Sequence, residues 1–160
     1  MKPEVRIEWL DGPADLDSVQ EIDRASFGSP WTRAMYEQEL QHAGQAFIAV
    51  LRAGSTRVAA YCSYRLVVDE IQINNVAVRP ESRRRGYGRA LIEFALRHGR
   101  RSGGNTAILE VRRSNDAARR LYAQAGFVQA AERPRYYANP EEDAVVMVKD
   151  VRNLEEDPVA

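Results

Sequence analysis

Residues 70–96 read EIQINNVAVRPESRRRGYGRALIEFAL, and this stretch changes from a strand pattern to a basic loop with two glycines and then to a helix pattern. In the strand, apolar residues occupy odd positions up to Ile73 and even positions from Val76 onward. The alternation slips by one residue at Asn74 and Asn75, which predicts a β-bulge that turns the following side chains to the opposite face. A turn at the two asparagines is the alternative.

The loop after this strand combines features that favour a pyrophosphate ligand. Gly86 and Gly88 allow backbone angles that other residues avoid, and a helix predicted over 89–100 offers unpaired N–H groups and the positive end of its dipole. The bulge just upstream leaves further backbone groups for a ligand. A solvated helix start and a patch for nucleic-acid phosphates are the alternatives, because the loop lacks the P-loop lysine and the three-glycine spacing of dinucleotide folds. Local positive charge comes from Arg79, Arg83, Arg84, Arg85 and Arg89.

Composition narrows the class of protein. The chain has 160 residues, the size of one domain, and its 23 Lys and Arg residues balance 23 Asp and Glu residues, so a nucleic-acid binder with a global basic excess is not expected. Cys62 is the only cysteine, which excludes an intramolecular disulfide, and His42 and His98 lack ligand-spaced partners, so no metal site is expected. The sequence has neither an export signal nor a run of about 18 apolar residues, so we expect a cytoplasmic protein without a membrane span.

The rest of the chain alternates between strand and helix patterns. The even-numbered apolar residues from Val58 to Val68 are expected on one face of a hairpin strand. Thr32 is expected to cap a short helix that begins directly after Thr32. This order predicts an α/β fold with one domain over residues 1–151 and a polar, disordered tail over 152–160. Strands are predicted at 4–10, 46–68 as a hairpin, 70–78, 105–111 and 143–150, and further helices at 14–26 and 115–127.

Two stretches resemble signatures of the GCN5-related N-acetyltransferase (GNAT) family. In residues 74–96, Arg83, Gly86 and Gly88 have the Arg/Gln-x-x-Gly-x-Gly/Ala spacing of the family's acetyl-coenzyme A (acetyl-CoA) loop. Residues 109–127, LEVRRSNDAARRLYAQAGF, are similar to the second signature. The resemblance implies a single-domain, mixed but mostly antiparallel sheet that is flanked by helices and carries the bulge in its fourth strand.

Two further stretches resemble one branch of the family, which acetylates the N-terminal alanine of a small-subunit ribosomal protein. Residues 27–40, FGSPWTRAMYEQEL, are similar to its Pro-Trp helix, and residues 132–147, ERPRYYANPEEDAVVM, to its Tyr-Tyr loop and final strand. Pro134 departs from the polar or basic residue that is usual there, and the whole resemblance covers about residues 5–149. We therefore expect a protein N-terminus as the acceptor, no direct contact with nucleic acid or membrane, and a monomer or weak dimer.

The resemblance implies acetyl-CoA as the cofactor. Its pantetheine arm is expected along the main chain of the fourth strand, and its pyrophosphate on the loop and helix start. Asn115 matches a position that touches the cofactor, and a helix N-cap is its alternative role. The expected cofactor-binding residues are Val76, Ala77, Val78, Arg84, Arg85, Gly86, Tyr87, Gly88, Arg89 and Asn115.

The reaction needs a base and an acid, because the amine attacks in its neutral form and a thiolate departs. Glu110 matches the family's general base, acting directly or through water, and Tyr122 matches the acid that protonates the thiolate. Without the resemblance, Glu110 would be a strand-end carboxylate paired with an arginine, and Tyr122 a core residue on the inward side of its helix. A backbone N–H of the fourth strand, first of all that of Val78, is expected to hold the oxyanion.

Three aromatic residues are candidates for the acceptor side. Trp31, Tyr136 and Tyr137 would form a wall around the first residues of a peptide, and ordinary core positions are the alternative. Three function classes stay open: an N-terminal acetyltransferase, an acetyltransferase for a lysine side chain or small amine, and a non-catalytic acyl-CoA sensor or nucleic-acid binder. Glu110 and Tyr122 at the family spacing, together with zero net charge, count against the third class.

Overall fold

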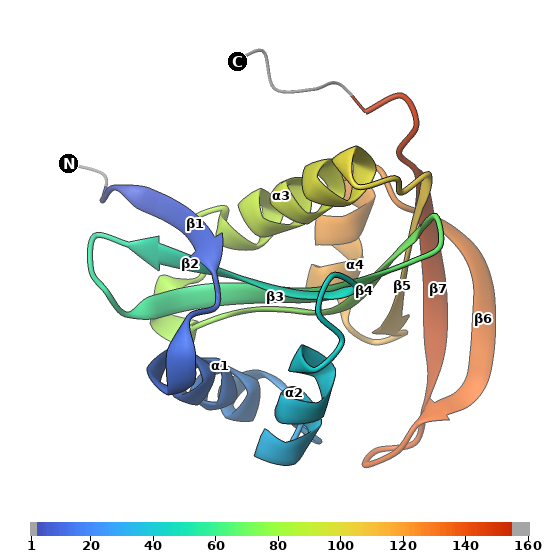
Figure 1. Cartoon of the computed structure of the whole chain (residues 1–160). Helices are drawn as coiled ribbons and strands as arrows, with labels where there is room; N and C mark the ends of the chain where they lie inside the picture. The colour runs from blue at the N-terminus through green and yellow to red at the C-terminus, as the bar shows by residue number, and fades with distance from the viewer. Residues whose placement is uncertain (1–2, 155–160) are drawn as a thin grey trace.

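The computed structural model describes residues 3–154 as a seven-stranded sheet flanked by helices (Figure 1). The strand order is β1-β2-β3-β4-β5-β7-β6, and β4 and β5 form the parallel pair in an otherwise antiparallel sheet. The mixed, mostly antiparallel α/β fold is thus confirmed. The strands are β1 Val5–Trp9, β2 Ala46–Ala53, β3 Val58–Val67, β4 Glu70–Val78, β5 Thr106–Arg112, β6 Val128–Tyr137 and β7 Glu142–Asp150. The helices are α1 Gly12–Ser26, α2 Arg33–Leu40, α3 Tyr87–Arg101 and α4 Asp116–Gln124, with a 3-10 turn at Pro80–Ser82.

Helices cover both faces of the sheet, so the molecule has three layers (Figure 1). On one face, α1 and α2 share an apolar cluster with β2 and β3 that includes Leu16, Ile22 and Ile48. On the other face, α3 and α4 share a larger cluster with the sheet that includes Leu91 and Leu109. We call these the α1–α2 face and the α3–α4 face.

Two helices begin at the caps that the sequence predicts. The Thr32 hydroxyl accepts a hydrogen bond from the Met35 N–H at 3.2 Å, and the Asn115 side chain accepts one from the Ala118 N–H at 3.2 Å. Each cap satisfies one of the N–H groups that a helix start leaves unpaired. Local sequence therefore fixes where α2 and α4 begin.

The predicted bulge is present in β4. Ser63 on β3 pairs with Asn75, and the next residue, Tyr64, pairs with Ile73, so Asn74 is the extra residue. Beyond this point β4 also separates from β5, because their parallel ladder ends at the pair of Ile73 and Leu109. The bulge thus coincides with a divergence of two central strands.

Several expected boundaries are wrong. Helix α3 begins at Tyr87 rather than at residue 89, because Gly86 supplies the cap with a left-handed φ of 80°. Val68 lies outside β3, in a turn with φ 58°, and is 92% exposed. Val58 packs in the cluster on the α1–α2 face, whereas Ala60 packs on the α3–α4 face. The register shift in the β2–β3 ladder beside Val58 accounts for this change of face.

Strand β6 was not predicted, since residues 132–137 were expected to form a loop. Nine of its ten residues are exposed, so neither face has the apolar alternation that marks a strand. Pro134 and Arg135, with φ 53°, lie where the β6–β7 register is irregular. The expected polar tail falls mainly on residues 155–160, outside the described residues, while Leu154 packs against the cluster on the α3–α4 face.

Candidate active site

The backbone of β4 beyond the bulge borders a gap in the sheet. The Arg79 N–H donates to the Ala59 carbonyl on β3 at 2.8 Å. Because N–H groups alternate sides along an antiparallel strand, those of Val76 and Val78 point the other way, toward β5. The β4–β5 ladder has already ended at Leu109 on β5, so these two residues face the gap. The divergence therefore presents main-chain groups that a ligand could bind.

The three residues expected to bind the cofactor on β4 differ in orientation. Strand alternation places the Ala77 N–H on the β3 side, and its side chain packs in the cluster on the α1–α2 face. The side chains of Val76 and Val78 approach Gly88 at the start of α3. The Val78 carbonyl accepts a hydrogen bond from Arg83 Nε at 3.1 Å, and the Val78 N–H points toward the gap. Val76 and Val78 thus offer the main-chain groups on this side.

The loop before α3 has the backbone shape of an anion site. Arg84 and Gly86 both have left-handed φ values, 65° and 80°, a shape that gathers successive N–H groups into a concavity. Gly88 lies in the first turn of α3, so the expectation that it needs unusual backbone angles is wrong. A Cβ atom there would lie 3.2 Å from Leu121 Cδ2, so the glycine allows α3 to pack closely against α4. Tyr87 is buried, so only its main chain is available.

The arginines of this region have different roles. Arg79 is 6% exposed, and its guanidinium donates to the Val58 carbonyl at 2.6 Å and to Glu21 at 2.9 Å. It is therefore a structural residue, and its inclusion among the charges around the loop is wrong. Arg89 pairs with Glu93 at 3.0 Å on the exposed side of α3. The exposed arginines of the loop itself are Arg83, Arg84 and Arg85.

Glu110 lies on β5 beside the same gap. Leu109 and Val111 point into the cluster on the α3–α4 face, so the Glu110 side chain is on the α1–α2 face. Its carboxylate lies 3.5 Å from Arg133 Nη2, and the Glu110 side chain is 24% exposed. Hydrogen bonding to Glu110 raises the pKa of Tyr136. The carboxylate is thus paired with an arginine, as the alternative expected, and is also accessible.

Tyr122 packs on the α3–α4 face of the sheet, opposite the face of Glu110. It is 8% exposed on the inward side of α4, with its ring edge-to-face against Phe127 at 6.0 Å. Burial raises the pKa of Tyr122 far above its ordinary value, and nearby Cys62 and Tyr137 act in the same direction. The phenol is therefore neutral and able to donate a proton at physiological pH. Packing and proton donation are compatible roles for this side chain.

Arg112 holds two aromatic residues in place and was missed by the sequence analysis. Its guanidinium lies 4.5 Å from the centre of the Tyr137 ring and donates to the carbonyls of Ala138 and Pro140, each at 3.0 Å. Tyr136 lies edge-to-face against Tyr137, with ring centres 5.0 Å apart. Burial is the main cause that raises the pKa of Tyr137 to about 12, and the negative charge of Glu110 on β5 is the second cause. A signal existed, because Arg112 is two residues after the candidate base and so lies on the same face of β5.

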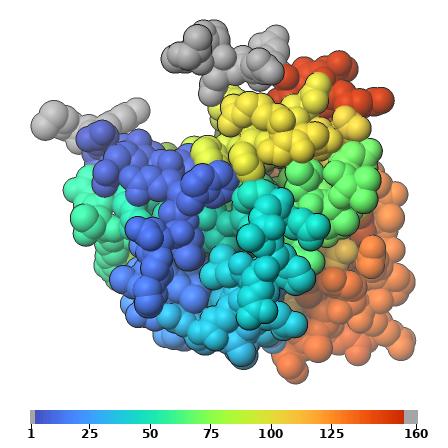
Figure 2. Space-filling view, in the orientation of Figure 1, coloured from blue at the N-terminus to red at the C-terminus, as the bar shows by residue number. Residues whose placement is uncertain are grey.

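Trp31 is not in contact with the two tyrosines. Its ring packs on Tyr36, with centres 5.2 Å apart, at the edge of the cluster on the α1–α2 face. The α1–α2 connection nevertheless reaches the β6–β7 connection, since a Cβ on Gly28 would lie 3.3 Å from the Asn139 carbonyl oxygen. In Figure 2 the surface of α2 adjoins that of the β6–β7 hairpin. The aromatic wall is therefore two separate pairs joined through the backbone.

Residues 16–127 match the sequence profile of the "Acetyltransferase (GNAT) family". The chain belongs to this family. It is 34% identical over 135 residues to the "[Ribosomal protein bS18]-alanine N-acetyltransferase" of Salmonella typhimurium, a match that covers 83% of this chain and 89% of that protein. The crystal structure of the ribosomal-protein-S18-alanine N-acetyltransferase from Escherichia coli superposes with a TM-score of 0.84 at 30% identity and covers 96% of this chain and 98% of that one.

A more distant GNAT structure shares the fold. The acetyl-CoA complex of NAA60 from Arabidopsis thaliana has a TM-score of 0.81 at 17% identity, covering 92% of this chain and 99% of that one. As a GNAT member, the chain is an acetyltransferase that uses acetyl-CoA. The residues present fit that cofactor, because the β4 main chain at the gap suits an amide-bearing arm and the loop before α3 suits a pyrophosphate. The assignment of each cofactor contact stays a prediction.

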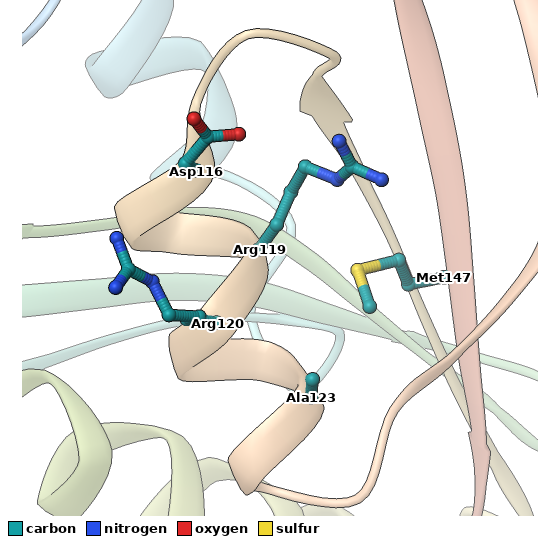
Figure 3. A pocket seen from close by; sticks show the side chains of 5 residues that line it. All are labelled: Asp116, Arg119, Arg120, Ala123 and Met147. Carbon is teal, nitrogen blue, oxygen red and sulfur yellow. The ribbon is translucent and has the colours of Figure 1, made fainter.

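A hollow of about 500 Å³ beside α4 lies apart from this site (Figure 3). Its α4 residues are on the side of the helix that faces away from the cluster containing Tyr122. Arg119 and Arg120 point to opposite flanks of α4, so they do not converge on one ligand. The lining residues are Asp116, Arg119, Arg120, Ala123 and Met147.

Across residues 3–154, no three His, Cys, Asp or Glu side chains are grouped so that they could hold a metal ion. Over the same range, no helix has the length and apolar character needed to cross a membrane.

Proposed function

We propose that this GNAT enzyme acetylates the N-terminal α-amine of a protein, and that its acceptor is the N-terminal alanine of ribosomal protein bS18. The observation that carries the proposal is the carboxylate of Glu110 beside the β4–β5 gap, with Tyr136 and Tyr137 next to it on the α1–α2 face. The Salmonella relative named for this acceptor, aligned over 89% of its length, supports the same assignment.

Glu110 acts as the base in this proposal. An α-amino group with a pKa near 8 costs about 1 kcal/mol to deprotonate at pH 7, whereas a lysine near 10.4 costs about 4.6 kcal/mol. A carboxylate that is accessible provides assistance for the first amine, either directly or through water. Because the α-amine costs less to deprotonate, a site with one accessible carboxylate favours an N-terminal acceptor over a lysine.

Tyr122 acts as the acid. Acetyl-CoA supplies the activated acetyl thioester and a thiolate leaving group. The neutral phenol of Tyr122 donates its proton to that sulfur, since its burial keeps it protonated. The Val78 N–H, which points toward the gap, donates to the carbonyl oxygen that gains negative charge. Acid, base and donor come from three different elements around one opening in the sheet.

A steady-state assay with peptides tests the acceptor. The peptides carry the first residues of bS18 and differ only in residue 1, which is Ala, Ser, Leu or N-acetylated Ala, and each also contains an internal lysine. We expect a kcat/KM at least tenfold higher for Ala than for Leu and no product from the blocked peptide. Equal acetylation of the blocked peptide would show that the lysine is the acceptor and would contradict the proposal. Mass spectrometry of bS18 from cells lacking the gene provides the matching test in vivo.

A further inference from the structure

Three polar side chains are buried together on the α1–α2 face. Asp23 from α1, Tyr36 from α2 and Tyr61 from β3 are 1%, 0% and 0% exposed. Both tyrosine hydroxyls donate to the Asp23 carboxylate, one to each oxygen, and the two hydroxyl oxygens are 3.3 Å apart. We call these residues the Asp23 triad. It connects two helices and the sheet through side chains that the proposed chemistry does not use.

The Asp23 triad is costly as a source of stability alone. Burial raises the pKa of Asp23, and the two tyrosine bonds oppose that rise. Burial likewise raises the pKa values of Tyr36 and Tyr61. Apolar side chains of similar size could fill such a core without the cost of removing a carboxyl group from water. Hydrogen bonds, unlike apolar contacts, are directional, so the Asp23 triad permits a single arrangement of α1, α2 and β3.

Helix α2 depends on polar contacts of this kind. It has eight residues, and only Tyr36 and Glu39 are buried. Its other large apolar residues, Met35 and Leu40, are 43% and 38% exposed, so apolar burial does little to orient the helix. Glu39 forms a bidentate pair with Arg65 on β3, at 2.6 and 2.7 Å, which provides a second point of attachment. A third attachment is at Arg33, which donates to Asp17 and Gln20 on α1 at 2.6 and 3.1 Å, so polar contacts at three positions orient α2.

The Asp23 triad is linked to the acceptor side through consecutive contacts. The Tyr36 ring packs against Trp31, which lies in the connection between α1 and α2. That connection approaches the β6–β7 connection, where Gly28 lies close to the Asn139 carbonyl. Asn139 follows Tyr137 by two residues. The negative charge of Glu110 contributes to the raised pKa of Tyr137. A displaced α2 would therefore change the boundary of the proposed acceptor site, whereas the β4 backbone is held separately by its ladder with β3.

We infer that Asp23, Tyr36 and Tyr61 are positioning residues for the acceptor: they hold the α1–α2 connection against the β6–β7 connection and so determine how well an acceptor peptide binds. They do not touch substrate, because all three are buried. The inference rests on the proposed function, since it assigns the acceptor to this side of the sheet. It adds a group of residues that control acceptor binding, in which Tyr36 and Tyr61 are 13 and 38 residues away from Asp23 in the sequence.

Tyr61→Phe and Tyr36→Phe test the inference because they keep the rings and remove the hydroxyls. We expect each variant to raise the KM for the Ala peptide about five- to twentyfold, with kcat within twofold and an unchanged KM for acetyl-CoA. The matched control is Tyr64→Phe, which removes another buried hydroxyl from β3, one that pairs with His98 Nδ1 at 2.9 Å in the cluster on the other face. If Tyr64→Phe raises the acceptor KM as much, or if the triad variants lower only the melting temperature, the inference is wrong.

The fluorescence of Trp31 gives a readout that needs no acceptor. The chain has two tryptophans, so a Trp9→Phe background isolates Trp31. Tyr36→Phe and Tyr61→Phe should increase iodide quenching of Trp31 at least twofold, whereas Tyr64→Phe should not. Unchanged quenching in both triad variants overturns the inference whether or not the peptide is a substrate. Failure of the wild-type enzyme to acetylate any N-terminal peptide would instead contradict the proposed function, and quenching would still decide whether the triad fixes the connection.

Discussion

The two sides of the β4–β5 gap are built in different ways. The expected cofactor side uses main-chain groups of a nearly continuous stretch, from Val76 through Arg89, on one strand, one loop and the first turn of α3. The proposed acceptor side depends on side chains of β5 and β6, and on supporting side chains of α1, α2 and β3, which are distant in sequence. A continuous main-chain site leaves a readable motif with fixed glycine spacing. A site assembled from separate side chains leaves only short, scattered signals, such as the two adjacent tyrosines at 136 and 137.

The largest expected effect is at Tyr122, the proposed acid. Tyr122→Phe keeps the edge-to-face packing with Phe127 and removes the proton donor. We expect kcat to fall by about 10² to 10⁴ with little change in acetyl-CoA affinity or melting temperature. Stopped-flow or steady-state assays together with calorimetry measure this. A kcat near the wild-type value would remove Tyr122 from the mechanism.

Glu110→Gln should give a smaller loss of kcat that depends on pH. Below the acceptor's pKa, near 8, the amine arrives protonated and needs a base, so the loss should be about 10- to 1,000-fold at pH 6.5. Above that pKa the amine arrives neutral, and the loss should shrink toward a few-fold at pH 9. A pH–rate profile of both proteins measures the difference. A loss that is the same at all pH values would mean that Glu110 positions the acceptor instead of deprotonating it.

Gly88→Val tests whether the cofactor side can be changed alone. The new side chain would press on Leu121 and push α3 away from α4 at the edge of the gap, so the dissociation constant for acetyl-CoA should rise more than tenfold. The acceptor KM, measured at saturating acetyl-CoA, should change less than twofold. Ala90→Val adds a branched side chain two residues later in the same helix and serves as the control. Unchanged acetyl-CoA affinity in a folded Gly88→Val protein would contradict the cofactor assignment.

Arg112→Lys changes the acceptor side instead of the cofactor side, and we expect it to have the smallest effect of the four variants. Lysine keeps the charge but cannot stack on Tyr137 and donate to two carbonyls at once. We expect the acceptor KM to rise about three- to fivefold while acetyl-CoA affinity stays constant, as measured by the peptide assay and calorimetry. An equal change in both constants would mean that the two sides are not separable.

Much of the cofactor side could be predicted because its signals are local. The switch of the apolar residues from odd to even positions between Ile73 and Val76 predicted the bulge, and the spacing of the glycines predicted the loop. The start of α3 was misplaced because Gly88 was assigned a backbone role, whereas its actual constraint is Leu121, 33 residues away in sequence. No local pattern reports a contact at that separation.

The acceptor side could be predicted only in part. Tyr136 and Tyr137 were found, but strand β6 was missed because it is exposed on both faces and has no apolar alternation. The Asp23 triad could not be predicted, since an aspartate on an otherwise apolar helix face looks the same in sequence whether or not two tyrosines meet it. Long-range hydrogen bonds, rather than periodicity, define this side of the site.

The early end of the β4–β5 ladder also divides the sheet mechanically. Within the sheet, a ladder of four residue pairs, from Glu70 with Thr106 to Ile73 with Leu109, joins the half made of β1 to β4 to the half made of β5, β7 and β6. The two half-sheets therefore meet along a seam that is closed at one end and open at the other. A molecule lying in the open end would bridge both halves and stabilise the native state by about 2.7 kcal/mol at a hundred times its dissociation constant. If acetyl-CoA is that molecule, we expect its binding to raise the melting temperature of the enzyme.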